Sequence, residues 1–185
     1  LGPENVLVVA PGLLGGTNTP KGGRLTIGAK SPLTGGIKES NSGGQAANAL
    51  GRLGIAAVIF TGKPVDPHAY YMLTIEPDGS AVLSRVDEWA GAGNYEVTDA
   101  VKAMRPEGDR YSTITNGPAG ESGLKASGIA VSDMKGYPKR FAGRGGLGAV
   151  MGSKGLKAIV VSDKGVATPA HADKEAFSAA VKTFS

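Results

Sequence analysis

Short apolar segments rich in β-branched residues recur along the chain and are separated by glycine-rich and polar stretches. Segments of this kind are typical of β-strands. Between two of them, Pro77-Asp78-Gly79 predicts a hairpin, because Pro presets φ and Gly accepts a positive φ. The predicted strands are Val6–Ala10, Leu25–Ala29, Ala56–Thr61, Tyr70–Ile75, Ala81–Val86, Ser112–Thr115, Ala126–Val131 and Ala158–Ser162.

Helical periodicity is found in fewer places than strand patterns. The predicted helices are Gln45–Leu53, Glu96–Met104, a glycine-rich helix near Gly146–Met151 and a tail that starts at Asp173. Because strands and helices do not alternate as strict βαβ units, the pattern favours an α+β fold over a doubly wound α/β sheet.

An ungapped internal repeat relates Asn41–Lys63 to Ala142–Lys164, at a shift of 142 − 41 = 101 residues. Both copies have a glycine-rich loop, a helix, a glycine and a buried strand. The repeat predicts two β-rich halves related by a pseudo-twofold axis. The coinciding residues include Gly44 and Gly145, Gly51 and Gly152, Gly54 and Gly155, and Lys63 and Lys164.

Composition indicates one globular domain with an unusual amount of glycine. Hydrophobic residues make up 41% of the 185 residues, enough for one buried core. The 30 glycines are roughly double the average usage, and they follow no collagen period. So many glycines indicate that the backbone approaches another group closely, either within the protein or in a ligand.

Charge and cysteine usage exclude several classes of function. The net charge of +4 comes from scattered basic residues without aromatic interleaving, so nucleic acid is not implied. With no cysteine, the chain has no disulfide, thiolate nucleophile or cysteine-ligated metal. No membrane span or signal peptide is visible. We expect the chain to be a fragment, since it lacks an initiator Met and ends within a helical pattern.

The segment Gly143–Gly148 satisfies the dinucleotide fingerprint G-x-G-x-x-G. That fingerprint needs a strand immediately before it, whereas Tyr137-Pro138-Lys139-Arg140 does not predict one. Asp163, 20 residues after Gly143, keeps the nucleotide-binding alternative open. A Walker A loop is excluded, because Ser153 separates Gly152 from Lys154.

Glycine-rich loops before helices can also hold anions, since free N–H groups and the helix N-terminus favour negative charge. Gly143–Gly148 and the first-half loop Asn41–Gly44 are two such candidates, which would suit a ligand with two phosphates. The alternative is that these glycines serve only as caps and in close packing. Arg24 could bind a phosphate or carboxylate, although taken alone it is better interpreted as a surface arginine.

Catalytic groups are not apparent elsewhere in the sequence. His68 and His171 are predicted in loops, and no Ser/His/Asp set, H-E-x-x-H motif or carboxylate pair can be assembled. We therefore expect the chemistry to be supplied from elsewhere. Trp89 is predicted to be a core residue.

Three blocks carry a family resemblance: GGRLTIGAKSPLTGGIKESNSGG (Gly22–Gly44), GPAGE (Gly117–Glu121) and RFAGRGGLGAVMGSKGLKAIVV (Arg140–Val161). In this order and spacing they resemble the N-terminal, cofactor-binding domain of the tungsten-containing aldehyde ferredoxin oxidoreductases. The resemblance spans nearly the whole chain. It assigns residues 1–166 to that domain, with its first strands missing, and residues 167–185 to the start of a following helical domain.

The resemblance implies a cofactor of tungsten, or molybdenum, held between two pterins whose phosphates share Mg²⁺. The domain would form the base under this bis-pterin cofactor. By the resemblance, the backbone carbonyls of Asn41 and Ala142 bind Mg²⁺, and Arg24 bridges the pterin and an iron–sulfur cluster. The resemblance also implies that the pterin phosphates are lined by Gly43, Gly44, Gly143 and Arg144. Phe141 departs from the small residue expected at its position.

The resemblance also implies the rest of the enzyme. A 4Fe-4S cluster would have its cysteine ligands outside this chain. The complete cytoplasmic enzyme would oxidise aldehydes to carboxylic acids and pass electrons to ferredoxin. Its partners would be ferredoxin, the aldehyde and the remaining domains of the same polypeptide, with a homo-oligomer left open and no nucleic acid or membrane. The alternative function is a nucleotide- or phosphate-binding module that uses Gly143–Gly148 without tungsten chemistry.

Overall fold

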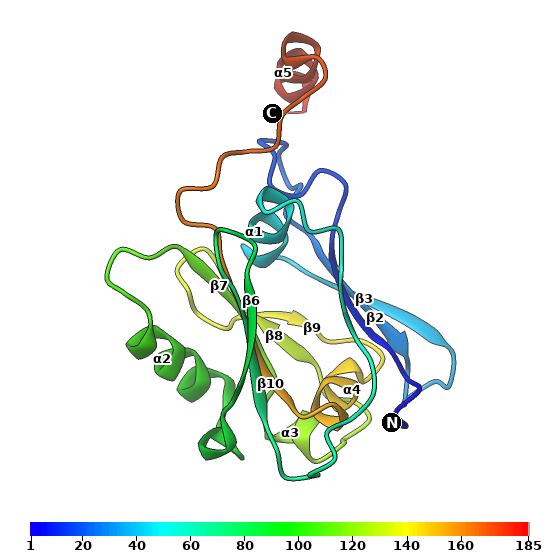
Figure 1. Ribbon diagram of the computed structural model, residues 1–185. Helices are drawn as coiled ribbons and strands as arrows, with labels where there is room; N and C mark the ends of the chain where they lie inside the picture. The colour runs from blue at the N-terminus through cyan, green and yellow to red at the C-terminus, as the bar shows by residue number, and fades with distance from the viewer. Residues whose placement is uncertain (185) are drawn as a thin grey trace.

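Two β-sheets form the framework of the computed structural model, which describes residues 1–184 (Figure 1). Neighbouring strands are antiparallel except β5 and β10, which are parallel. The mixed sheets and the helices confirm the predicted α+β class. The four-stranded sheet has the order β3 (Ile37–Ser42), β2 (Leu25–Lys30), β1 (Leu7–Pro11) and β4 (Val58–Phe60). The six-stranded sheet has the order β6 (Ala81–Arg85), β5 (Tyr71–Ile75), β10 (Leu156–Ser162), β7 (Tyr111–Thr115), β8 (Ile129–Val131) and β9 (Arg140–Ala142).

Two short helices lie between the sheets. The helix α1 (Ala46–Arg52) contacts β1, β7 and β10, while α4 (Leu147–Ser153) contacts β2, β8 and β10. A third, α3 (Pro118–Glu121), packs against α4. The longer α2 (Asn94–Met104) lies along the other face of the six-stranded sheet. The helices α1 and α4 therefore occupy the region where the two sheets face each other.

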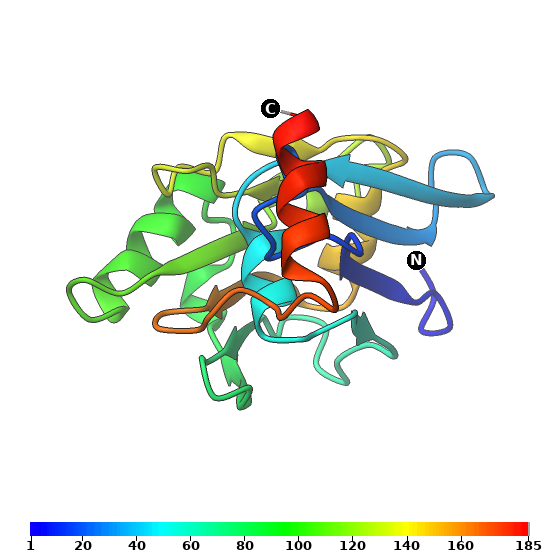
Figure 2. The same ribbon diagram turned by 90° about the horizontal axis from the view of Figure 1, so that it is seen from above.

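The last helix, α5 (Lys174–Thr183), stands apart from the sheets (Figures 1 and 2). It begins where the sequence predicts, because the Asp173 side chain caps it by accepting a hydrogen bond of 2.8 Å from the Ala176 N–H. None of its residues is buried. Ser185, at the end of the predicted 167–185 segment, lies outside the described residues. Within residues 1–184, no helix has the length and apolar character needed to cross a membrane.

The two halves repeat one topology. The order β3-β2-β1-β4 in one sheet matches β9-β8-β7-β10 in the other, with antiparallel pairs throughout. The ends of α1 and α4 are related by the sequence shift, since 147 − 46 = 101 and 153 − 52 = 101. The predicted duplication is therefore confirmed. Only the six-stranded sheet continues past this shared unit, with the β5–β6 hairpin beyond β10; the other sheet stops at β4.

Equivalent glycines solve the same packing problem in each half. A Cβ on Gly51 in α1 would overlap the carbonyl oxygen of Gly15, and a Cβ on Gly152 in α4 would overlap that of Gly120. Each helix therefore rests directly on the backbone of a preceding turn. Such close approach is possible only without a side chain.

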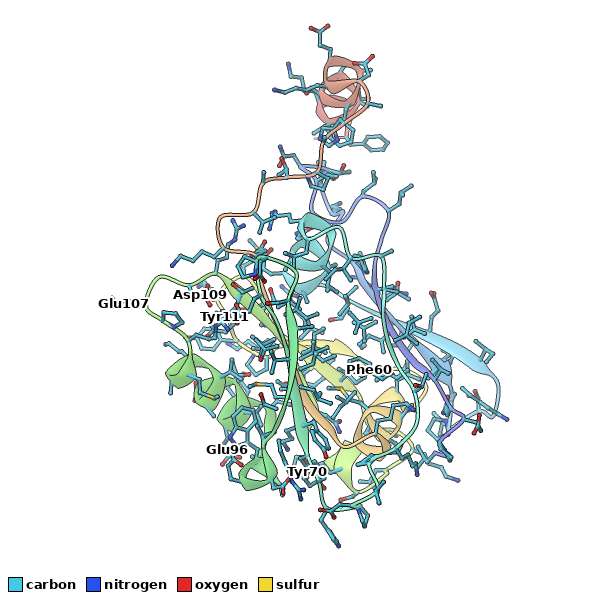
Figure 3. The ribbon with its side chains drawn as sticks, in the orientation of Figure 1. Phe60, Tyr70, Glu96, Glu107, Asp109 and Tyr111 are labelled. Carbon is cyan, nitrogen blue, oxygen red and sulfur yellow. The ribbon has the colours of Figure 1, made fainter. Side chains whose placement is uncertain are left out.

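The core has two parts. The larger part lies between the sheets and includes residues of β1, β2, α1, β8, α4 and β10. The smaller part lies between α2 and the six-stranded sheet, where Val97 and Val101 pack with Met72 and Trp89. Trp89 is only 8% exposed, as predicted for a core residue. Figure 3 shows Tyr70 near the start of α2 and Tyr111 near its far end, at the two margins of this smaller core.

A buried ion pair joins β10 to α3. Lys157 is 0% exposed and pairs with Glu121. Lys157 also donates to the carbonyl oxygen of Ala92 at 2.7 Å, and the second oxygen of Glu121 accepts the Gly91 N–H at 2.8 Å. The pair therefore fixes the segment before α2 as well as α3, the element on which α4 rests.

Two strands, β3 and β9, escape the sequence prediction. Both are edge strands, and β3 buries only Ser40 and Ser42, so its buried face lacks the apolar residues that signal a strand. The three residues of β9 are too few to show an alternating pattern. The short helix α3, which begins with Pro118, is likewise missed.

Gly152→Ala and Gly51→Ala should each destabilise the chain by about 1–3 kcal/mol, because the added methyl group meets backbone that cannot move aside. Helix propensity alone would give the opposite sign, a gain of up to about 1 kcal/mol. Urea unfolding measures the difference. Gly36→Ala is the control, since no atom lies within 4 Å of its Cβ position, and it should be nearly neutral. Stabilisation by either helix substitution would contradict the packing described here.

Removing one member of the buried ion pair should be more damaging than replacing both. Glu121→Ala leaves the Lys157 ammonium buried without its counter-charge and should cost about 3–5 kcal/mol. The double variant Glu121→Leu, Lys157→Met should recover much of this loss, because no buried charge remains. Chemical denaturation of both variants checks the order, and equal losses would show that the pairing itself matters little.

Candidate functional site

The two halves meet along the edge strands β3 and β9, which contact each other. An edge strand presents backbone N–H and C=O groups that take no part in its own sheet. The junction of the duplicated halves thus gathers such groups from two sides.

A polar pocket of about 450 Å³ opens at this junction. Four of the seven site residues predicted from the sequence line it, namely Arg24, Asn41, Gly143 and Arg144. They come from the start of β2, the end of β3 and the segment after β9. The pocket also has lining residues that the prediction did not include: Lys38, Glu39, Ser40 and Phe141. Lys38, Glu39 and Ser40 were missed because β3 was not recognised as a strand.

Positive charge is in excess around this pocket. Arg24, Lys38 and Arg144 face a single acidic residue, Glu39. Among the described residues, none of these three cationic side chains forms an ion pair or a hydrogen bond. Unpaired cations around one cavity attract an anionic ligand. Within residues 1–184 there is no group of three His, Cys, Asp or Glu residues that could hold a metal ion.

The side chain of Asn41 is already occupied. The Thr26 hydroxyl donates to Asn41 Oδ1 at 2.7 Å, and Asn41 Nδ2 donates to Glu39 Oε1 at 3.2 Å. A ligand at Asn41 would therefore meet its backbone. Ala142 is 0% exposed and has no polar side chain, so it too can offer only backbone groups. Its neighbours Phe141 and Gly143 line the same pocket as Asn41.

The glycines after β9 divide into two groups. Gly145 and Gly146 have positive φ and are buried, and a Cβ on Gly148 would lie 2.6 Å from the carbonyl oxygen of Gly128. Gly143 differs: it is exposed, and the nearest atom to its Cβ position is 4.0 Å away. The fold requires glycine at positions 145, 146 and 148. Gly143 is under no such constraint, so its backbone can approach a ligand.

The sequence predicted an anion site over the whole Gly143–Gly148 loop, but only the first part of that loop is open to a ligand. The start of α4 is buried, with Leu147 at 0% exposure, and the Gly148 N–H donates to the Ser127 carbonyl at 3.1 Å. Close packing explains this part of the loop. What remains open to a ligand is Gly143 and Arg144.

The first-half loop shows the same division. Gly44 has a φ of +121° and packs against the Ser132 carbonyl, while Gly43 has no atom within 4 Å of its Cβ position. Neither residue lines the pocket, although both follow β3 directly. Hydrogen bonds then join the loops of the two halves: the Arg144 N–H donates to Ser40 Oγ at 3.0 Å, and Ser31 Oγ donates to the Gly145 carbonyl at 2.6 Å.

The nucleotide-binding alternative fails for a different reason from the one the sequence suggests. The sequence predicted no strand immediately before Gly143, and this is wrong, because β9 leads directly into it. However, β9 pairs only with β8 in antiparallel fashion, and β8 and β7 separate it from β10. The β9–α4–β10 unit is therefore not a parallel βαβ crossover. Asp163 is engaged by Arg52 at 2.5 Å and by Arg110 at 2.8 Å.

Several known proteins are similar to this chain in sequence and in fold. The model of the family described as aldehyde ferredoxin oxidoreductase, N-terminal domain, matches residues 1–163. Over 184 residues the chain is 39% identical to the tungsten-containing aldehyde ferredoxin oxidoreductase of Pyrococcus furiosus, an alignment that covers 98% of this chain and 28% of that protein. An aliphatic sulfonate oxidoreductase, WOR-like subunit, of the same organism is 28% identical over 100% of this chain and 29% of its own length.

A solved structure gives the same result. The active site complex BamBC of benzoyl coenzyme A reductase, determined with 1,5-dienoyl-CoA, matches with a TM-score of 0.86 and 32% identity, over 97% of this chain and 26% of that chain. The chain thus spans little more than a quarter of the proteins it matches. Together with the duplicated fold, these matches show that the chain belongs to the aldehyde ferredoxin oxidoreductase family, within its N-terminal domain.

Proposed function

We propose that this chain is the tungstopterin-binding domain of an oxidoreductase that oxidises aldehydes to carboxylic acids, with ferredoxin as electron acceptor. The observation that carries the proposal is the polar, cationic pocket where β3 and β9 meet. We assign the domain to residues 1–166 and the start of the next, helical domain to residues 167–185.

The residues present fit a bis-pterin cofactor. Its phosphates are anionic, and the pocket offers Arg24 and Arg144, whose side chains have no partner among residues 1–184. Gly143 is exposed and the space at its Cβ position is open, so a ligand can approach its backbone. For Mg²⁺, which prefers oxygen ligands, the backbone carbonyls of Asn41 and Ala142 are the groups proposed, since neither side chain is available.

Each residue then has a distinct task. Arg24 and Arg144 bind and orient the anionic parts of the cofactor, and the planar Arg24 guanidinium is the donor proposed to reach toward the iron–sulfur cluster. Thr26 and Glu39 hold the Asn41 side chain and so fix its peptide. When bound, the tungsten, or molybdenum, pterin supplies the two-electron redox chemistry.

The remaining functions are assigned to other parts of the protein. This chain has no cysteine, so the thiolate ligands of a 4Fe-4S cluster would come from elsewhere. Substrate selection would also lie outside, because matched proteins named for aldehydes, sulfonates and a coenzyme A thioester all share this domain. The domain would thus supply the base of the cofactor site.

Residues 1–185 produced alone should show no aldehyde oxidation with ferredoxin or a dye as acceptor, because they provide neither cluster ligands nor a second wall for the cofactor. A spectrophotometric assay checks this against the full-length enzyme as positive control. Turnover by the chain alone would contradict this division of tasks.

Arg24→Ala in the full-length protein should lower the tungsten and pterin retained per chain by about tenfold or more, since a charged hydrogen bond contributes roughly 1.5–3 kcal/mol. Arg24→Lys should not restore it, because an ammonium lacks the planar fork. Metal analysis and pterin fluorescence measure the content. The control is Arg85→Ala, a remote arginine paired with Asp66 and Asp87, which should leave content unchanged. Unchanged content in Arg24→Ala would refute the assignment.

A further inference from the structure

Lys38 is a pocket residue to which no role has yet been given. It lies on β3, opposite Ala29 of β2, and therefore on the face of the sheet that Ala29 buries. Ser40 and Ser42 share this face, because side chains alternate along a strand. Lys38 is half-buried, and this face turns toward the loop that follows β9.

The stem of Lys38 is held against the second half of the molecule. A Cβ on Gly145 would lie 2.5 Å from Lys38 Cγ and 3.2 Å from Lys38 Cβ. Gly145 has a φ of +76°, and its carbonyl accepts the Ser31 hydroxyl. The first atoms of the lysine side chain therefore cross the junction between the halves over a glycine.

The ammonium group at the end of this stem has no hydrogen-bond or ion-pair partner among residues 1–184. Glu39 is adjacent in sequence and also lines the pocket, but its side chain leaves β3 on the other face, where its Oε1 accepts a hydrogen bond from Asn41 Nδ2. Lys38 also borders a larger hollow beside β1, which is lined mainly by apolar residues such as Val6 and Val8. Glu4 and Glu39 line it too, but Lys38 forms an ion pair with neither of them. An ammonium is better accommodated by the polar pocket, which Arg24, Asn41 and Arg144 also line.

We propose that Lys38 is a third cationic ligand of the pocket and binds a phosphate oxygen of the ligand held there, together with Arg24 and Arg144. This rests on the proposed function, because it takes the anion to be a phosphate of the pterin cofactor. A phosphate monoester carries close to two negative charges at neutral pH, so a pair of such groups has more negative charge than two arginines can offset, and a lysine beside them offsets a further part of it. The two guanidinium groups give directed contacts, and the ammonium supplies a point charge.

The test is Lys38→Met in the full-length protein. Methionine keeps an unbranched stem over Gly145 and removes the charge, so the urea midpoint should stay close to that of the parent. Pterin and tungsten retained per chain after gel filtration should fall by about tenfold, which corresponds to about 1.4 kcal/mol. Lys38→Arg should retain most of the cofactor. Lys30→Met is the matched control: Lys30 is an exposed lysine at the end of β2 and should behave like the parent.

The outcomes separate this inference from the function on which it rests. If Arg24→Ala and Arg144→Ala lose cofactor while Lys38→Met keeps it, Lys38 has no such role and the cofactor site stands. Equal losses in Lys38→Met and Lys30→Met would also overturn the role, because they would reflect overall charge alone. If none of the pocket variants loses cofactor, the proposed function falls as well.

Discussion

The direct contact of helix on backbone, at Gly51 over Gly15 and at Gly152 over Gly120, is the constraint on which the structure depends. It allows α1 and α4 to sit deep enough to contact strands of both sheets at once. With larger residues at Gly51 and Gly152 the helices would have to move away from this backbone, and the strands that they contact would be displaced. The meeting of the edge strands β3 and β9, and the pocket between them, rely on that placement.

Electrostatics at the junction follow from this geometry. Three buried or half-buried charges elsewhere are paired: Lys157 with Glu121, Asp163 with Arg52, and Arg105 with Asp109. Around Arg105, bonds from Glu76 and Asp109 outweigh desolvation and raise its pKa above the usual value. Around the pocket, three cationic residues accompany one acidic residue, Glu39, and the side chains of Arg24, Lys38 and Arg144 form no ion pair among residues 1–184. This local excess of positive charge suits an external anion.

Much of the fold was predictable because duplication leaves a signal that does not depend on hydrophobic pattern. The glycine pairs at a fixed shift predicted two halves, and α1 and α4 obey that shift at both ends. What could not be predicted was the junction. Ser40 and Ser42 on β3 are buried polar residues, and a strand that buries hydroxyl groups looks like a loop in the sequence. Lys38 and Glu39 were missed with it. Residues Gly145–Gly148 were wrongly included in the predicted anion site, because a sequence does not distinguish glycines needed for packing from glycines that bind a ligand.

The two halves differ at one edge, and this difference has a consequence for handling the molecule. In the six-stranded sheet β5 covers β10, but the equivalent strand β4 has a free side on which Ile59 is 60% exposed. Beside it runs an apolar groove of about 700 Å³, shared with β5 and β6. An uncovered strand next to apolar surface readily takes up another chain by main-chain pairing. In a concentrated solution of these residues, β4 is therefore one edge at which self-association is expected, and a charged residue at Ile59 should reduce it.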